Sequence, residues 1–162
     1  MIMMYSSQDK VQEKIKRCIA DKSVWLNLSY MNLNELPSNI PNFITQLDCS
    51  NNNLIKLPGN LPNSITTLFC MNNQIKKLPN NLPDSLELLN CNHNQIRRLP
   101  NNLPISLTTL YCSSNQITKL PNNLPINILF CNSNQLNELP NNMPDSIAYL
   151  NCNHNQIKSI PM

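Results

Sequence analysis

The sequence contains a single glycine, Gly59, and only 13% of its residues are charged. Phosphate-binding loops of the P-loop and dinucleotide kinds need several glycines, so the sequence excludes both. The net charge of +3 is too small to indicate a nucleic-acid partner on its own. No apolar run approaches the roughly 20 residues of a membrane span, and the first residues lack the regions of a signal peptide. These absences argue against nucleotide-dependent enzymes and membrane proteins.

What the sequence does contain is an internal repeat with a period of about 21 residues. The stretch LNCNHNQIRRLP, which begins at Leu89, returns almost unchanged as LNCNHNQIKSIP from Leu150. Each unit carries a leucine, one variable residue and a cysteine, and one interval, from Cys112 to Cys131, is shorter than the others by two positions. Catalysis seldom needs a second copy of its site, whereas stacked coils need one unit many times. The recurring cysteines are Cys49, Cys70, Cys91, Cys112, Cys131 and Cys152.

An asparagine stands three residues after each of these cysteines. A side-chain amide both donates and accepts hydrogen bonds, so it can satisfy backbone groups of its own and of neighbouring coils. Two residues further on the unit has isoleucine or leucine, followed by Leu-Pro or Ile-Pro. We therefore predict structural roles for Asn52, Asn73, Asn94, Asn115, Asn134 and Asn155.

Written out, the unit is L-x-C-x-x-N-x-[IL]-x-x-L-P-x-N-L-P-x-S-[LI]-x-x. It resembles the leucine-rich-repeat family, whose core is L-x-x-L-x-L-x-x-N-x-L, and the resemblance covers residues 24–162 in seven repeats. The LPxNLPxSL half is similar to the short repeats of bacterial effector proteins. The asparagine-rich, cysteine-bearing form is similar to repeat proteins of large DNA viruses of amoebae. This second resemblance implies a viral protein that binds a host protein or is packed in the virion.

The repeat predicts an α/β solenoid: a right-handed leucine-rich-repeat superhelix with one parallel β-sheet. Each coil carries two prolines, such as Pro79 and Pro83. Proline lacks an N–H and disfavours helix in the residue before it, so we expect a convex side of extended or 3₁₀ segments. The two residues missing between Pro125 and Leu129 should be absorbed on that convex side.

The chain divides into residues 1–22, a capping helix, and residues 23–162, seven coils of which the last is truncated. A terminal coil exposes core, so it needs a cap. Val11, Ile15, Cys18 and Ile19 fall at helical spacing and predict an amphipathic helix over residues 8–21. A helix lying on a membrane surface is the alternative, which the short stripe without bulky aromatics disfavours.

The cysteines are interpreted as small hydrophobes facing the core. The chain has no C-x-x-C, and the interval between successive repeats is not a zinc-ligand spacing. Ladder cysteines in adjacent coils point the same way, which is poor geometry for a disulfide. Free thiols without a signal peptide predict a reducing, intracellular location: the cytoplasm, which for a viral protein is the host cytoplasm, or the virion.

No group of residues in the sequence predicts catalysis, so we expect neither an enzyme nor a cofactor. His93 and His154 occupy the same repeat position three coils apart. At about 4.8 Å per coil they lie about 14–15 Å apart, too far to share a metal or a proton. They are interpreted as copied surface residues.

Outward positions of the strands differ between repeats, and differences on a rigid scaffold indicate function. Aromatic and other apolar side chains there are typical of interface anchors. The alternative is that they only strengthen cross-strand packing. We predict a non-catalytic module that binds a protein partner through the concave β-face. The partner-binding residues, named here the concave patch, are Phe69, Met71, Leu88, Tyr111, Ile128, Phe130 and Tyr149.

A second set of residues is basic: Lys and Arg side chains follow one another along one edge of the middle coils, between Glu35 and Glu138. The simplest interpretation is a solvated corner; the alternative is a polyanion binder, with an acidic protein or nucleic acid as the ligand. No recognisable nucleic-acid fold accompanies the cations, which disfavours nucleic acid. The basic column comprises Lys76, Lys77, Arg97, Arg98 and Lys119, preceded by Lys56.

The last strand, around Leu150 and Cys152, should be an uncovered edge of the sheet. Unpaired strand edges promote pairing with another chain. A homodimer through the uncapped last coil, or a self-associating structural component of a virion, is therefore a further hypothesis.

Overall fold

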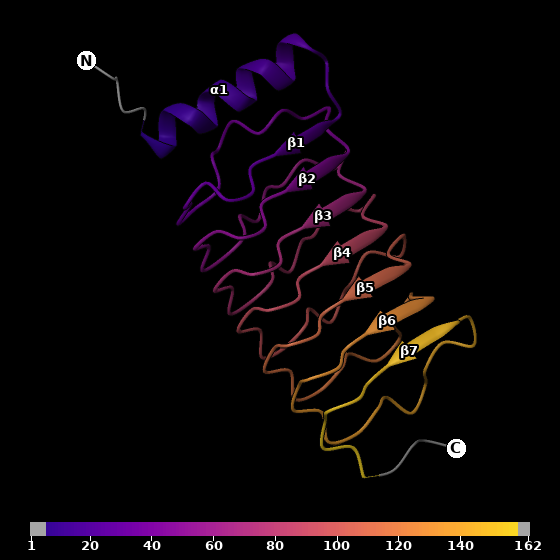
Figure 1. Cartoon of the computed structure of the whole chain (residues 1–162). Coiled ribbons are helices and arrows are strands. Elements are labelled where there is room, and N and C mark those ends of the chain that lie inside the picture. The colour runs from indigo at the N-terminus through magenta and orange to yellow at the C-terminus, as the bar shows by residue number, and fades with distance from the viewer. Residues whose placement is uncertain (1–5, 159–162) are drawn as a thin grey trace.

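The computed structural model describes residues 6–158 as one helix followed by a single seven-stranded sheet. All neighbouring strands are parallel and pair in sequence order, so the sheet follows the stack of coils (Figure 1). The predicted parallel solenoid with an N-terminal helix is confirmed. The elements are α1 (Ser7–Ala20), β1 (Trp25–Asn27), β2 (Gln46–Asp48), β3 (Thr67–Phe69), β4 (Leu88–Asn90), β5 (Thr109–Tyr111), β6 (Ile128–Phe130) and β7 (Tyr149–Asn151).

Each strand is only three residues long, and its middle leucine aligns with the leucine of the next strand. The register is kept across the shorter repeat: Leu110 still pairs with Leu129, the middle residue of the next strand. The two missing residues are absorbed on the convex side, as predicted. Ile126 takes the place that Leu107 holds one coil earlier, and both are fully buried.

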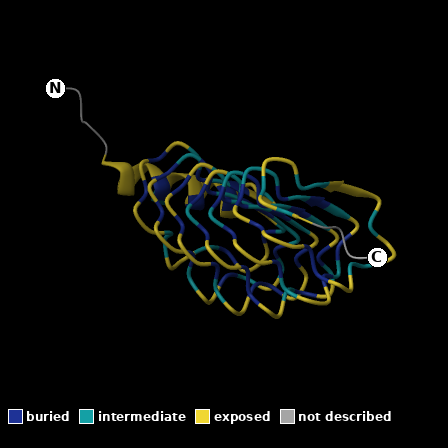
Figure 2. Cartoon of the chain, turned by 90° about the horizontal axis from the view of Figure 1, so that it is seen from below, coloured by how far each residue is buried: buried dark blue, intermediate teal, exposed yellow. Residues whose placement is uncertain are grey.

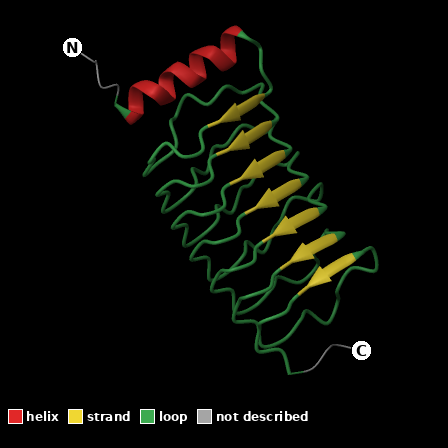
Figure 3. Cartoon of the chain, in the orientation of Figure 1, coloured by secondary structure: helices red, strands yellow, loops and turns green. Residues whose placement is uncertain are grey.

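The convex side consists of loops and turns (Figure 3). Where a 3₁₀ segment was expected, the coils form a single turn with a hydrogen bond across three residues. The Leu86 backbone N–H donates to the Pro83 carbonyl at 3.0 Å, and the Ile147 N–H donates to Pro144 at 3.1 Å. Proline suits the first position of this turn, because the turn uses only the carbonyl of that residue and no N–H is needed there.

The core fills the space between the sheet and the convex loops (Figure 2). Its two strand-side columns are the middle leucines, such as Leu68 and Leu89, and the cysteines that follow the strands. The ladder continues past the assigned strands, since the Cys70 N–H donates to the Asn90 carbonyl at 2.8 Å. Alternation with a period of two therefore places both columns inside the coil.

The asparagines form a second ladder where each coil leaves its strand. Asn94 accepts a hydrogen bond from the Ile75 N–H at 2.9 Å. Its amide nitrogen donates to the carbonyls of Cys70 and Cys91, at 3.0 and 3.1 Å, and to that of Asn92 at 3.2 Å. One buried carboxamide thus satisfies four backbone groups from two coils. The same arrangement recurs at Asn73, Asn115, Asn134 and Asn155.

Helix α1 lies across the open end of the first coil and buries Val11, Ile15 and Cys18. Ser6 begins the helix with a capping box: its hydroxyl accepts from the Asp9 N–H at 3.1 Å, and the Asp9 carboxylate accepts from the Ser6 N–H at 3.0 Å. Ile19, which the helical spacing placed on the apolar stripe, is instead 52% exposed. The helix ends one residue later, so nothing continues alongside it to cover that side chain.

Asn94→Ala should lower the free energy of unfolding by about 1–3 kcal/mol, because it leaves buried backbone groups without partners. Urea denaturation followed by circular dichroism measures this change. Asn102→Ala, at an exposed convex position, is the matched control and should stay within about 0.5 kcal/mol. Equal losses in the two variants would contradict the ladder's role.

Candidate functional site

The concave patch lies on the strands and on the residue after each cysteine. Every strand buries its middle residue except β7, and turns the flanking residues outward. The sequence predicted an exposed face, but six of the seven patch residues are half-buried and only Tyr149, at 66%, is exposed. The reason is lateral packing: each outward side chain lies between the equivalent side chains of the strands on either side.

The sheet brings the aromatic members of the patch together. The rings of Tyr111 and Phe130 stack with their centroids 5.2 Å apart and an interplanar angle of 29°. Phe69 lies two strands away from Tyr111, with Asn90 between them in register. The Asn90 amide nitrogen donates to the sulfur of Met71 at 3.3 Å, which links β4 to the coil that carries Phe69 and Met71.

The repeat position that holds Phe69, Tyr111 and Phe130 is occupied in other coils by Asn or Asp, which stabilise the turn after the strand. Where the residue is Asn or Asp, its side-chain oxygen accepts from the backbone N–H two residues later. Asn27 does so with Ser29 at 2.9 Å, Asp48 with Ser50 at 2.9 Å, and Asn90 with Asn92 at 3.1 Å. Phenylalanine has no acceptor, so the coils of Phe69 and Phe130 lose this turn-forming bond.

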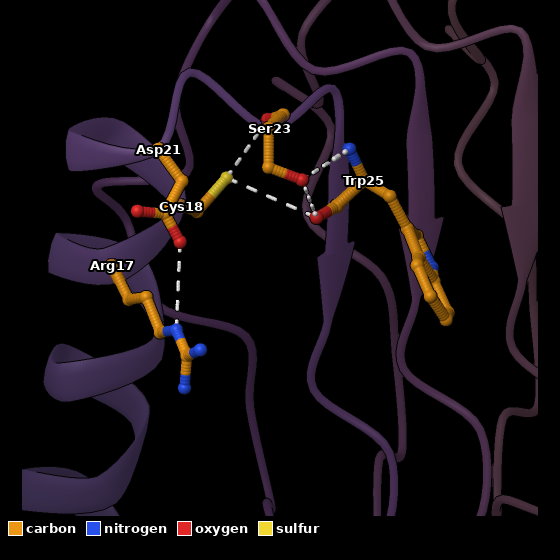
Figure 4. A network of polar contacts seen from close by, with 5 residues as sticks. All are labelled: Arg17, Cys18, Asp21, Ser23 and Trp25. Atoms are coloured by element: carbon orange, nitrogen blue, oxygen red, sulfur yellow. Dashed lines mark hydrogen bonds and ion pairs between the residues drawn. The ribbon is translucent and has the colours of Figure 1, made fainter.

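Trp25 is the first residue of β1, as Tyr149 is of β7, so both belong to the same outward-facing column of side chains. Trp25 was not among the predicted binding residues. Ser23 fixes its backbone: the hydroxyl donates to the Trp25 carbonyl at 3.0 Å, and the Trp25 N–H donates back at 3.3 Å. The indole ring points away from α1 (Figure 4) and is 52% exposed. Its place in the outward column was the signal that could have found it.

Comparison with solved structures identifies the family. The LRR domain of a Shigella effector matches with a TM-score of 0.86 and 37% sequence identity, over 99% of this chain and 72% of that one. The chain belongs to the leucine-rich-repeat family. YopM from Yersinia pestis shares the fold at 23% identity and a TM-score of 0.81, over 99% of this chain and 51% of that one. YopM from Yersinia enterocolitica matches at 26% identity and a TM-score of 0.62, over 98% of this chain and 44% of that one.

This leucine-rich-repeat chain therefore spans about half the length of either YopM protein. No protein-family model matches the chain, and no curated protein does.

The two histidines of this leucine-rich-repeat protein lie at a turn position where the backbone φ angle is positive. His93 and His154 are exposed and have φ angles of 53° and 54°, in the left-handed region. Asparagine and histidine tolerate this region better than most residues. The position therefore explains the repeated histidines without chemistry. Equivalent residues with positive φ are Tyr30, Asn51, Asn72, Ser114 and Ser133.

The cysteine column lies in the core for five of its six members. Cys49, Cys70, Cys91, Cys112 and Cys131 are fully buried and unbridged. Burial disfavours the charged thiolate, and it raises the pKa of Cys91 and Cys131 to about 12. Cys152 is only half-buried. Within residues 6–158, no three His, Cys, Asp or Glu side chains gather closely enough to hold a metal ion.

The basic column is exposed along its whole length. Lys119 forms an ion pair with Glu138 at 3.5 Å, and the Arg97 guanidinium donates to Gln116 at 3.3 Å. Two surface grooves of about 490 and 480 Å³ run beside the column, and both are lined by Arg98. The structure thus brings the predicted cations together on one surface, separate from the concave patch.

The last strand differs from the others in burial. Leu150 is 40% exposed, whereas its counterparts in the six earlier strands are buried. Homodimerisation through this edge stays a prediction.

No helix in the described part of the chain has the length and apolarity that crossing a membrane requires.

The buried thiols should make stability fall at high pH. Above the ordinary thiol pKa of 9.0, unfolded chains lose protons that folded chains keep. The free energy of unfolding should therefore decrease between pH about 9 and 12, by up to about 1.4 kcal/mol per pH unit and thiol. Urea denaturation at several pH values measures the slope.

Cys91→Ala should reduce this slope by about one proton. Leu89→Ala, which removes a neighbouring core side chain that does not titrate, should lower stability but leave the slope unchanged. A slope that is the same for Cys91→Ala and the native protein would refute the assignment.

Proposed function

We propose that this leucine-rich-repeat protein is a non-catalytic interaction module that binds a protein partner through the concave patch. The observation that carries this proposal is the replacement of a turn-forming Asn or Asp by Phe69, Tyr111 and Phe130 in three coils. The coils of Phe69 and Phe130 give up this local hydrogen bond and gain an aromatic side chain, and in the coil of Tyr111 the Asn92 side chain of the preceding coil accepts from the Ser113 N–H instead. Aromatic side chains at the centre of a surface are the residues that contribute most to binding energy.

The chemistry of the face supports a protein partner. Among all the residues of the seven strands, Asp48 is the only charged one. Depletion of charge around aromatic and methionine side chains is the composition found at the cores of protein interfaces. The alternative role in cross-strand packing accounts for the stacking of Tyr111 on Phe130. Tyr149, whose strand pairs only with β6, is left exposed and available for contact.

The rigidity of the scaffold supports the proposal as well. Each strand is hydrogen-bonded to its neighbours, and the asparagine ladder fixes the turn that follows it. Binding to a surface that is already ordered loses little conformational entropy. The patch therefore needs no rearrangement of the backbone before a partner docks.

The relatives and the repeat pattern suggest the kind of partner. One similar chain is the LRR domain of a Shigella effector, and YopM is described as a leucine-rich effector protein. Together with the resemblance to repeat proteins of amoebal DNA viruses, this leads us to propose an intracellular host protein as the partner. The proposed location is the host cytoplasm or the virion.

The test is affinity capture from amoebal lysate with quantitative mass spectrometry. A Phe69→Ala, Tyr111→Ala, Phe130→Ala variant should lose at least about tenfold of the captured partner, since anchors of this type contribute about 2 kcal/mol or more. Circular dichroism and a thermal melt establish that the variant is folded.

The matched control replaces three exposed apolar side chains outside the strands: Phe43→Ala, Ile55→Ala and Ile105→Ala. This variant removes a similar amount of apolar surface and should capture the partner at the native level. If the native protein, the concave variant and the control capture the same proteins in equal amounts, the concave face is not the binding surface.

A further inference from the structure

We propose that the basic column is a second binding surface, and that it takes a short acidic peptide segment. This surface is separate from the concave patch and does not depend on it. Together with Lys56, which precedes it, the column presents cations from four successive coils. Within residues 6–158, Glu138 is the only carboxylate that forms an ion pair with any of them.

The fold does not require positive charge at these positions. At the repeat position of Arg98, the first coil has Glu35 and a later coil has Glu138. At the position of Arg97, other coils have Ile55 and Thr118. All these coils share one sheet register, so acidic, apolar and neutral side chains serve the solenoid equally well. The clustering of cations in the middle coils therefore has a reason outside folding.

The backbone holds the cations side by side. The Gln95 N–H donates to the Ile75 carbonyl at 2.9 Å, and the Thr118 N–H donates to the Arg97 carbonyl at 3.4 Å. These bonds fix neighbouring coils beneath the column at the strand spacing of about 4.8 Å. Like charges held this close repel one another, and a bound polyanion relieves the repulsion.

The two grooves give the column a shape that fits a peptide. They share Arg98, Leu99 and Asn101, so they lie side by side, and together their linings come from four coils. Leu99 is buried at the base, whereas the asparagine is exposed. Carboxylates of a peptide would meet the guanidinium and ammonium groups, while amide side chains such as that of Asn101 can pair with the peptide backbone.

The length of the column favours a short peptide over nucleic acid. Four coils span about 14–15 Å, which is four or five residues of an extended chain. Glu35 and Glu138 bound the column, and they would repel a polyanion that continues past it. None of the side chains lining the two grooves, all in the described part of the chain, is aromatic, so bases would find no stacking platform.

The experiment measures fluorescence anisotropy of a labelled peptide of about eight alternating Asp and Glu residues, at about 50 mM salt. The native protein should bind it, and a Lys77→Glu, Arg97→Glu, Arg98→Glu variant should bind at least about tenfold more weakly. The matched control is Lys10→Glu, Lys14→Glu, Lys16→Glu, which makes the same charge change on exposed positions of α1. The control, and the Phe69→Ala, Tyr111→Ala, Phe130→Ala variant, should retain native affinity.

Three results would overturn the proposal: no binding by the native protein, equal loss in the column variant and the α1 control, or tighter binding of a single-stranded DNA through the same residues. The last result would assign the column to nucleic acid. If the charge reversal prevents folding, Lys77→Gln, Arg97→Gln, Arg98→Gln keeps long polar side chains, and its affinity for the peptide decides the question instead.

Discussion

The structure depends on the buried asparagine carboxamide at the end of each strand. A coil that turns sharply away from a three-residue strand leaves backbone N–H and C=O groups pointing into the stack. Leaving such groups without partners costs free energy comparable to a lost hydrogen bond. The Asn94 side chain satisfies four of them in two coils. This carboxamide fixes the spacing of the coils, and that spacing keeps seven short strands in one register.

The near-absence of glycine is possible because the same stack holds strained positions in place. Each turn needs one residue with positive φ, which ordinarily favours glycine. Here His93 and Ser114 adopt it, and their N–H groups donate to the next coil at 3.0 Å. Helix α1 ends in the same way, with Lys22 at a φ of 50° where glycine is usual. Neighbouring coils thus stabilise conformations that a single coil would not retain.

In a repeat protein the coils can be compared with one another, because each repeat position occurs several times in the same backbone environment. Leucine and asparagine positions hardly vary between coils, and both contact the interior. The position of Phe69 varies between aromatic and turn-forming residues, and that of Arg98 varies between cations and Glu138. Variation at a constant backbone separates what the solenoid needs from what one surface needs. Both proposed surfaces rest on this separation rather than on charge or hydrophobicity alone.

The sequence by itself determined the period of the solenoid, the parallel sheet, the inward phase of Leu89 and Cys91, and the position of the asparagine ladder. The alternation within a strand and the nearly constant length of the repeat decide which side chains face inward, and no tertiary information is needed for that. Only the tertiary structure decided how exposed each outward residue is. Ile19 was misjudged and Trp25 was missed, because the exposure of a side chain depends on which atoms of other segments lie beside it. The grooves beside Arg98 likewise exist only between stacked coils, so no single repeat could have revealed them.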